Sequence, residues 1–217
     1  MSRFAWLPKP LHRWLVAQRD RRRQARQARE LATLRERSVK RVVVGAGPTH
    51  YEGWVSTDMA ALDLLDEGTW SRYVAEGSLD AILAEHVWEH LDAAQALTAA
   101  RTCLRFLKPG GRLRVAVPDG LHPDPAYVAQ VRPGGSGPGA DDHKLLYTHD
   151  SFAAVFEAAG FRTDKLEYFD AQGLFHAVDW DPADGMIGRS QRFDRRNRKG
   201  LVYTSIVIDA LKPADRG

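Results

Sequence analysis

Three short stretches of the sequence place carboxylate and imidazole side chains together. They are Glu85-His86, Asp119 with His122, and Asp141-Asp142-His143. A hydroxyl becomes a good nucleophile when a His or carboxylate within about 3 Å takes its proton, and neighbouring carboxylates raise the basicity of a His. We therefore predict that His143 acts as a general base, oriented by Asp119 or Asp142. Glu85 and His86 are the other catalytic candidates.

These residues also have structural interpretations. His143 could be a surface or capping residue. His86, Glu89 and His90 lie at a predicted helix start, where a Glu is favourable and a His could cap or pack. The clustered acids could instead hold a divalent cation through oxygen ligands of the kind that Mg²⁺ prefers. Nothing in the spacing demands a metal, so the sequence assigns no metal ligand.

A glycine turn between two predicted strands indicates a second kind of chemistry. The β-branched run at 42–44 ends at Gly45-Ala46-Gly47, and the next predicted strand ends at Asp58. Glycines let a ligand approach the backbone, and an acidic residue can accept hydrogen bonds from both ribose hydroxyls. We therefore expect a nucleoside site here. A dinucleotide is disfavoured because His50 stands where the third glycine would, and little room remains for a helix before the second strand.

Strands and helices are predicted to alternate from residue 41 onward. The predicted strands are 42–44, 53–57, 79–84, 112–117, 165–169 and 201–211, and the main predicted helices are 92–107 and 149–159. This alternation is typical of an α/β fold with a largely parallel sheet covered on both faces. The Pro- and Gly-rich segment 121–142 is predicted to be a long loop that borders the site.

The connection between the last two predicted strands is polar and contains one Trp. Trp180 lies between Asp179 and Asp181, a combination that can hold a carbohydrate by stacking and by accepting hydrogen bonds from its hydroxyls. The alternative is a packed loop with a solvated basic rim.

The positive charge of the chain is concentrated at its N-terminus. Residues 1–41 hold thirteen Lys and Arg against three Asp and Glu, so the overall charge of +3 leaves about −7 on the rest. We predict a basic helical extension at 1–40 and a single domain at 41–217. Leu11, Trp14 and Leu15 share one face of the predicted helix. That face could pack on the domain, lie on a membrane surface, contact nucleic acid or pair two copies of the chain.

The composition is that of a globular protein, with 44% hydrophobic and 27% charged residues. The single cysteine, Cys103, cannot form an intrachain disulfide, which favours a reducing compartment. The apolar stretches near the N-terminus are too short for a signal-peptide core or a membrane span. The sequence therefore predicts a cytoplasmic protein.

Two segments carry a resemblance to a known family. LDAILAEHVWEHL at 79–91 and LRFLKPGGRLRVAVPD at 104–119 resemble class I S-adenosylmethionine-dependent methyltransferases, in particular small sugar O-methyltransferases of polysaccharide biosynthesis. The resemblance spans about residues 41–212. It implies a Rossmann-like sheet, mostly parallel with an antiparallel last strand, and S-adenosyl-L-methionine as the cofactor.

The resemblance also implies roles for particular residues. Gly45, Ala46 and Gly47 would flank the methionine part of the cofactor, Asp58 would hold the ribose, Asp63 and Leu64 would lie near the adenine, and Glu85 would stand near the cofactor. The sequence departs from the family pattern at two positions. Val43 stands where an acidic residue is common, and Thr49 replaces the third glycine, so contacts to the cofactor's amino group do not follow from the pattern.

The implied reaction is methylation of a hydroxyl on a sugar or oligosaccharide by in-line displacement with general-base assistance. The net negative charge of the chain after residue 41 argues against an extended binding surface for nucleic acid. Two alternatives stay open. One is methylation of RNA or another anionic partner recruited by the basic helix, and the other is a non-catalytic module that binds the cofactor.

Overall fold

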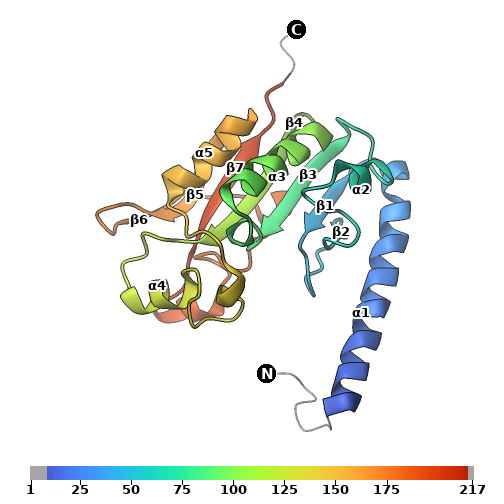
Figure 1. Ribbon diagram of the computed structural model, residues 1–217. Coiled ribbons are helices and arrows are strands. Elements are labelled where there is room, and N and C mark those ends of the chain that lie inside the picture. The colour runs from blue at the N-terminus through green and yellow to red at the C-terminus, as the bar shows by residue number, and fades with distance from the viewer. Residues whose placement is uncertain (1–8, 215–217) are drawn as a thin grey trace.

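Seven strands form one mixed sheet in the order β2-β1-β3-β4-β7-β5-β6 (Figure 1). They are β1 (Arg41–Val44), β2 (Val55–Ser56), β3 (Leu79–Glu85), β4 (Leu107–Pro118), β5 (Arg162–Phe169), β6 (Phe175–Ala177) and β7 (Ser205–Leu211). The first four strands are parallel, whereas β7 runs antiparallel to β4 and β5, and β6 runs antiparallel to β5. The predicted α/β sheet, mostly parallel with an antiparallel last strand, is confirmed.

The computed structural model describes residues 9–214, without the side chains of 9–14 and 16. Its helices are α1 (Lys9–Ala32), α2 (Glu67–Ser71), α3 (Ala93–Phe106), α4 (Pro125–Val131) and α5 (His149–Ala159). The predicted apolar face of Leu11 and Trp14 lies outside the described side chains. No helix in the described part of the chain is long and apolar enough to cross a membrane.

Local sequence explains where the two main helices begin. Asp92 and Gln95 form a capping box at the start of α3. Thr148 and Ser151 do the same for α5, which ends at Gly160 in the left-handed conformation with φ 108°. Capping boxes satisfy N–H groups that a helix start leaves free, and glycine accepts a positive φ at little cost. These signals account for the agreement between α5 and the predicted helix 149–159.

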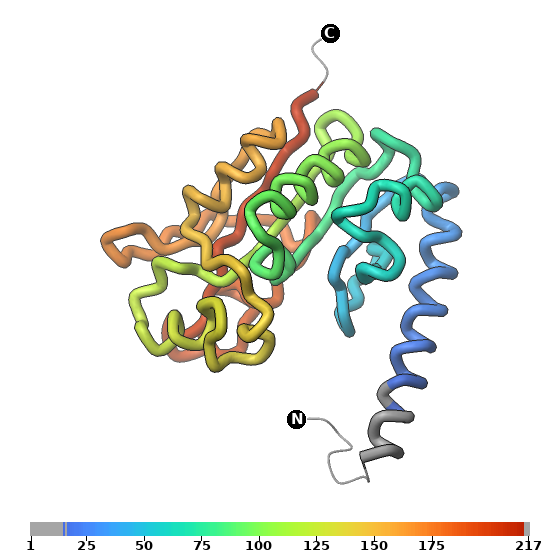
Figure 2. Tube along the Cα trace, viewed as in Figure 1, coloured from blue at the N-terminus to red at the C-terminus, as the bar shows by residue number. Residues whose placement is uncertain are grey.

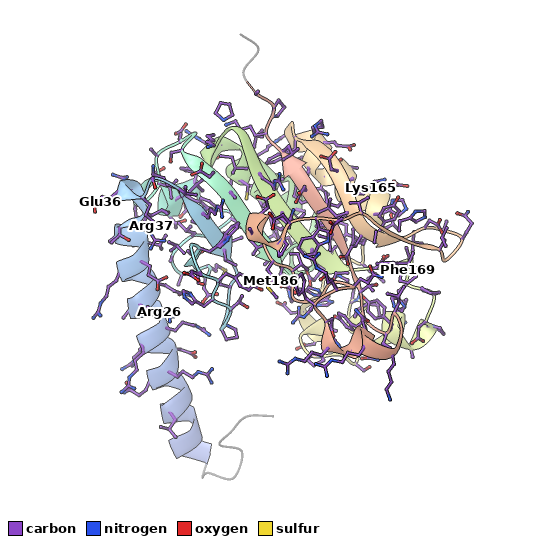
Figure 3. The ribbon with its side chains drawn as sticks, turned by 180° about the vertical axis from the view of Figure 1, so that it is seen from behind. Arg26, Glu36, Arg37, Lys165, Phe169 and Met186 are labelled. Atoms are coloured by element: carbon purple, nitrogen blue, oxygen red, sulfur yellow. The ribbon has the colours of Figure 1, made fainter. Side chains whose placement is uncertain are left out.

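The two faces of the sheet are covered differently. Helices α3 and α5 lie on one face, where buried residues such as Cys103, Phe106 and Phe152 pack on the strands. The opposite face carries Trp180 and Ile187 from an irregular segment. Figure 3, seen from behind, shows the stretch that carries Met186 crossing this face. Both faces are covered as predicted, but an extended segment replaces helices on the second one.

A buried ion pair fastens this segment to the sheet. The Arg114 side chain is 1% exposed, and its Nε and Nη2 donate to the two carboxylate oxygens of Asp209 at 2.7 and 2.9 Å. Its Nη1 donates to the carbonyls of Asp181 and Gly185, both at 2.8 Å. The guanidinium also lies over the Trp180 ring, 4.8 Å from its centre.

Trp180 therefore belongs to the packed interior. It is 8% exposed, and its Nε1 donates to Glu167 Oε1 at 2.9 Å. A ring enclosed in this way has no free face for a sugar. The carbohydrate-stacking interpretation of Trp180 is wrong, and the packed-loop interpretation holds.

Helix α1 runs along the β2 edge of the sheet (Figures 1 and 2). Its last turns are anchored, because Gln27 is 3% exposed and Leu31 is fully buried in the main core. Just after the helix, Arg35 donates to the carbonyls of Ser71 and Tyr73. The second half of α1 thus packs on the remainder of the chain.

Two local differences from the predicted elements have simple causes. The predicted loop 121–142 contains α4, which begins with Pro125 in its first turn and an Asp124 cap. The Pro and Gly residues that suggested a loop flank this helix, and Pro at a helix start is favourable. The predicted strand 201–211 begins only at Ser205, after a 3-10 turn at Arg195–Lys199.

Candidate functional site

The glycine turn after β1 is held open by backbone conformations that suit glycine. Gly45 and Gly47 have φ values of 59° and 50°. A Cβ on Gly45 would lie 2.6 Å from Val87 Cγ2, so no larger residue fits there without movement. The Ala46 N–H donates to the Thr57 carbonyl at 2.8 Å, which ties the turn to the end of β2.

A first cavity of about 370 Å³, here called the turn cavity, opens above this turn. Its walls are Val43, Val44, Gly45, Ala46, Gly47, Pro48, Thr49, Tyr51, Leu83, Glu85, His86, Gly188 and Arg189. The predicted residues Gly45, Ala46, Gly47 and Glu85 are all among them. Arg189, which the sequence did not single out, gives this cavity a positive side chain.

A second cavity of about 300 Å³, here called the apolar cavity, adjoins the first and shares Val44, Gly45 and His86 with it. Its other walls are Met59, Leu62, Asp63, Leu64, Leu65, Val87, His90 and Leu91. The predicted pair Asp63 and Leu64 lies here. A polar cavity joined to an apolar one suits a ligand with one charged end and one flat, hydrophobic end.

Asp58 stands beside the turn with both carboxylate oxygens in use. Oδ1 accepts from the Gly47 N–H at 2.8 Å, and Oδ2 accepts from Gln27 Nε2 at 3.0 Å. Arg23 Nε lies 3.5 Å from the same Oδ2. The residue predicted to hold a ribose is therefore also the link between the glycine turn and α1.

Glu85 fixes a wall of the turn cavity. Its Oε2 accepts from the Gly188 N–H at 3.0 Å and its Oε1 from the Arg189 N–H at 2.8 Å. The proximity of Glu85, together with burial, which is the larger cause, raises the pKa of Tyr51 to about 12. Because both oxygens of Glu85 bind backbone, its geometry is that of a positioning residue and not of a free base.

A third cavity of about 270 Å³, here called the polar cavity, lies on the other side of His86. It is lined by His86, Glu89, His90, Gln130, Val131, Gly137, Pro138, Ala140, His143, Arg189, Arg196 and Tyr203. Figure 2 shows the two segments that supply most of these residues, in yellow and in orange to red, gathered at the same end of the sheet. The predicted residues His86 and His143 both face this cavity.

His86 is common to all three cavities. It has a φ of 57°, and it is the one residue other than glycine with a positive φ in the described chain. Its Nδ1 lies 3.0 Å from Glu89 Oε1, and its Nε2 lies 3.0 Å from Ser205 Oγ. A strained backbone costs about 1–3 kcal/mol and is concentrated at functional sites, so the conformation marks His86 as a candidate for function.

Glu89 is the most unusual group in the polar cavity. Its side chain is 1% exposed, and neither carboxylate oxygen completes a hydrogen bond of good geometry. Burial by itself raises the pKa of Glu89, but the nearby imidazoles of His86 and His90 outweigh it and the pKa is lowered. The carboxyl is therefore charged, buried and open to a further partner.

His143, the predicted general base, lines the polar cavity, but neither of its predicted partners contacts it. Its Nδ1 is 2.7 Å from the Val131 carbonyl, to which it donates. Asp142 instead has Oδ2 3.3 Å from His90 Nδ1. The prediction that Asp142 orients His143 is corrected, because a backbone carbonyl on α4 does so.

Asp119 is also not a partner of His143. It is fully buried, and its two oxygens accept from the N–H groups of Leu121 and Phe169 at 2.9 and 2.7 Å. Burial raises its pKa. Asp119 is therefore a structural residue that joins the end of β4 to the end of β5, and it lines none of the three cavities. His122, stacked 4.0 Å from the Tyr127 ring, is likewise buried.

The sequence missed several residues of the polar cavity. Glu89 and His90 had been interpreted as a helix start, but a single 3-10 turn, Trp88–His90, precedes α3 and directs both into the cavity. Arg189, Arg196 and Tyr203 come from the irregular connection before β7. The basic residues of this connection were the signal in the sequence that pointed to it. Their position in space depends on the contacts that Glu85 and Arg114 make with the connection, and no local sequence pattern shows those contacts.

Comparisons with known proteins give one family match and several similar folds. The profile of the methyltransferase domain family matches residues 56–115, from β2 into β4. No curated protein sequence is significantly similar to this chain.

Similar solved structures include two S-adenosylmethionine-dependent methyltransferases and one O-methyltransferase family protein. An S-adenosylmethionine-dependent methyltransferase from Archaeoglobus fulgidus is 15% identical over 86% of this chain and 94% of its own, with a TM-score of 0.46. One from Thermotoga maritima is 14% identical over 94% of each chain, with a TM-score of 0.45. An O-methyltransferase family protein from Burkholderia thailandensis is 13% identical over 75% of this chain and 37% of its own, with a TM-score of 0.45.

Proposed function

We propose that the chain, in which residues 56–115 match the methyltransferase domain family, is a class I, S-adenosylmethionine-dependent methyltransferase that methylates a hydroxyl of a small polyhydroxylated acceptor, a sugar or an oligosaccharide end. The observation that carries this proposal is the place of His86. It lines the turn and apolar cavities on one side and the polar cavity on the other. A single imidazole therefore faces both the cofactor site and the acceptor site.

The residues around the turn fit the cofactor. The turn cavity offers the backbone of Gly45–Gly47 and the Arg189 side chain to the charged amino-acid end, and the apolar cavity offers Leu62 and Leu64 to the adenine. Asp58 lines neither of these two cavities but accepts from the Gly47 N–H beside them, and we assign the ribose to it on the family pattern. When bound, S-adenosylmethionine supplies an electrophilic methyl group on a sulfonium.

The polar cavity suits a small acceptor rich in hydroxyls. Its walls carry donors and acceptors from Gln130, Arg189, Arg196 and Tyr203, and its volume of about 270 Å³ is close to the lower end of the range of small-molecule sites. Arg196 lies with its guanidinium 3.4 Å from the centre of the Tyr203 ring, which holds both side chains in place. A cavity of this size admits a monosaccharide or a chain end, and not a folded helix of RNA.

His86 is the residue we assign to proton removal, in place of His143. An oxygen–carbon bond forms while a sulfur–carbon bond breaks, so the acceptor oxygen must lose its proton to a nearby base. His86 Nε2, which lies 3.0 Å from the Ser205 Oγ, takes this proton, and the Glu89 carboxylate near Nδ1 stabilises the resulting imidazolium. His143 lines only the acceptor side.

An acceptor screen tests this function. Protein without an affinity tag is incubated with S-adenosylmethionine labelled on its methyl group and with monosaccharides, oligosaccharides or transfer RNA. We expect label to enter a methyl ether of a saccharide, with little dependence on salt. Labelled RNA, with activity that falls steeply as salt rises, would contradict the proposal. Cofactor binding without transfer to any acceptor would indicate a non-catalytic module.

One observation favours the RNA alternative as a second candidate. A cavity of about 300 Å³ between α1 and the glycine turn is lined by Arg19, Arg22, Arg23 and Arg26. Arg23 and Arg26 contact Asp58 and Glu30, which offsets part of their charge, and the positive charge that remains on the four side chains would attract phosphate. The salt dependence in the acceptor screen distinguishes this candidate from the first.

The proposed role of Asp58 gives a binding prediction. Asp58→Ala removes the acceptor for both ribose hydroxyls, so we expect S-adenosylhomocysteine to bind at least about tenfold more weakly, or about 1.4 kcal/mol. Titration calorimetry on the folded variant measures this.

Gln27→Ala is the matched control, because it breaks the Asp58 link to α1 and leaves the carboxylate in place. Equal weakening by both changes would show that Asp58 acts by docking the helix.

A further inference from the structure

We propose that Glu89, His90 and His143 form a binding site for a divalent first-row transition-metal ion. One ligand atom from each of the three lies within 4.8 Å of the others, and they are the one such group among the residues that the structure describes. All three line the polar cavity. The sequence assigned no metal because positions 89, 90 and 143 show no metal-binding spacing.

The state of Glu89 is the first observation that points to a cation. Its side chain is 1% exposed, and both carboxylate oxygens lack a hydrogen bond of good geometry. A buried carboxylate normally needs hydrogen bonds, a paired charge or a metal, because removing it from water is costly. The His86 Nδ1 contact at 3.0 Å meets this need only in part.

The two imidazoles of the cluster are held in different ways. His143 Nδ1 donates to the Val131 carbonyl at 2.7 Å, so its Nε2 carries the free lone pair. In metal sites the second ring nitrogen of a ligating His almost always binds a carboxylate or carbonyl, as His143 Nδ1 does here. His90 Nδ1 lies 3.3 Å from Asp142 Oδ2 and is buried without completing a hydrogen bond, so it is a second unsatisfied group in this cluster.

The donor set indicates the class of ion. Two imidazoles and one carboxylate suit Zn²⁺, Co²⁺ or Fe²⁺, whereas Mg²⁺ and Ca²⁺ prefer oxygen ligands alone. With bonds of about 2.1 Å, ligands of a shared ion lie at most about 4.2 Å apart, so small side-chain rotations close the site. The cavity of about 270 Å³ leaves room for further ligands from water or an acceptor.

The side chains that line the polar cavity include two positive ones, Arg189 and Arg196, besides the negative Glu89. Arg196 is paired with Asp194 through Nη2 at 2.6 Å, which offsets its charge. Asp142 adds a negative charge beside His90. Binding of the ion does not depend on the proposed function. Its role in holding an acceptor hydroxyl next to His86 does rest on that function.

The test is a Co²⁺ titration of the full chain, purified without a His tag and treated with chelator. We expect one equivalent to bind, with visible d–d absorption bands of nitrogen and oxygen ligation. Glu89→Gln and His143→Gln should each weaken Co²⁺ binding at least about tenfold, as loss of a ligand does. His149→Gln is the matched control, because His149 contacts Asp150 and Tyr168 away from the cavity.

Two results would overturn the metal site. One is no Co²⁺ binding by the folded wild type, and the other is binding that Glu89→Gln and His143→Gln leave unchanged. Titration with S-adenosylhomocysteine on the same variants confirms that they are folded. Co²⁺ binding without methylation of any saccharide would uphold the site and reject the proposed acceptor, so the two failures are distinguishable.

Discussion

His86→Asn is expected to lower the rate of methyl transfer at saturating cofactor by about 10²–10⁴-fold, the usual contribution of a general base. Asn is chosen because, after glycine, it is among the residues that best tolerate the positive φ of 57° at this position, so the backbone should keep its conformation. The variant loses the imidazole that joins the Glu89 carboxylate to the Ser205 hydroxyl. Single-turnover assays with the acceptor found in the screen measure the effect.

The control for this prediction is cofactor affinity. S-adenosylhomocysteine should bind His86→Asn within about threefold of the wild type, less than 1 kcal/mol, because His86 is one of many residues around the two cofactor cavities. A rate that stays within a few-fold of the wild type would return the base assignment to His143. A parallel loss of affinity would mean that His86 shapes the cofactor site.

Asp209→Asn is expected to lower the free energy of unfolding by about 3–5 kcal/mol, because it leaves the Arg114 charge buried without its partner. Both side chains are almost fully buried, and the two hydrogen bonds between them are 2.9 Å or shorter. The substitution keeps the shape of the side chain, so the loss reports the charge and not a cavity. Urea unfolding followed by circular dichroism measures it.

Asp164→Asn is the matched control, since Asp164 lies opposite Asp209 in the β5–β7 register and pairs with Arg162 at the surface. Exposed pairs contribute about 0–1 kcal/mol, so this variant should unfold nearly as the wild type does. Replacing Arg114 and Asp209 together with Met and Leu should recover most of the stability. Equal losses from Asp209→Asn and Asp164→Asn would contradict the assignment.

The sequence predicted the elements whose structure is determined by residues close together in the chain. The helix at 149–159, the strand before Glu85 and the glycine turn follow from caps, β-branched runs and backbone freedom. The antiparallel last strand came from the family resemblance.

The partners of individual side chains could not be predicted, because they come from distant segments. Asp119 binds the Phe169 N–H fifty positions away, and Glu85 binds the Gly188 N–H across 103 positions. Glu89 was missed for a related reason. A helix start would have directed it to solvent, and a turn of three residues directs it inward.

The short β2 strand at one edge of the sheet has a consequence for solubility. An edge strand presents unpaired N–H and C=O groups on which a second chain can add, and this is a common origin of aggregation. Here α1 runs along that edge, and Arg19, Arg22, Arg23 and Arg26 lie beside it. The helix blocks access to the edge, and its like charges repel another copy of the same surface. The basic extension thereby protects the sheet against edge-to-edge association.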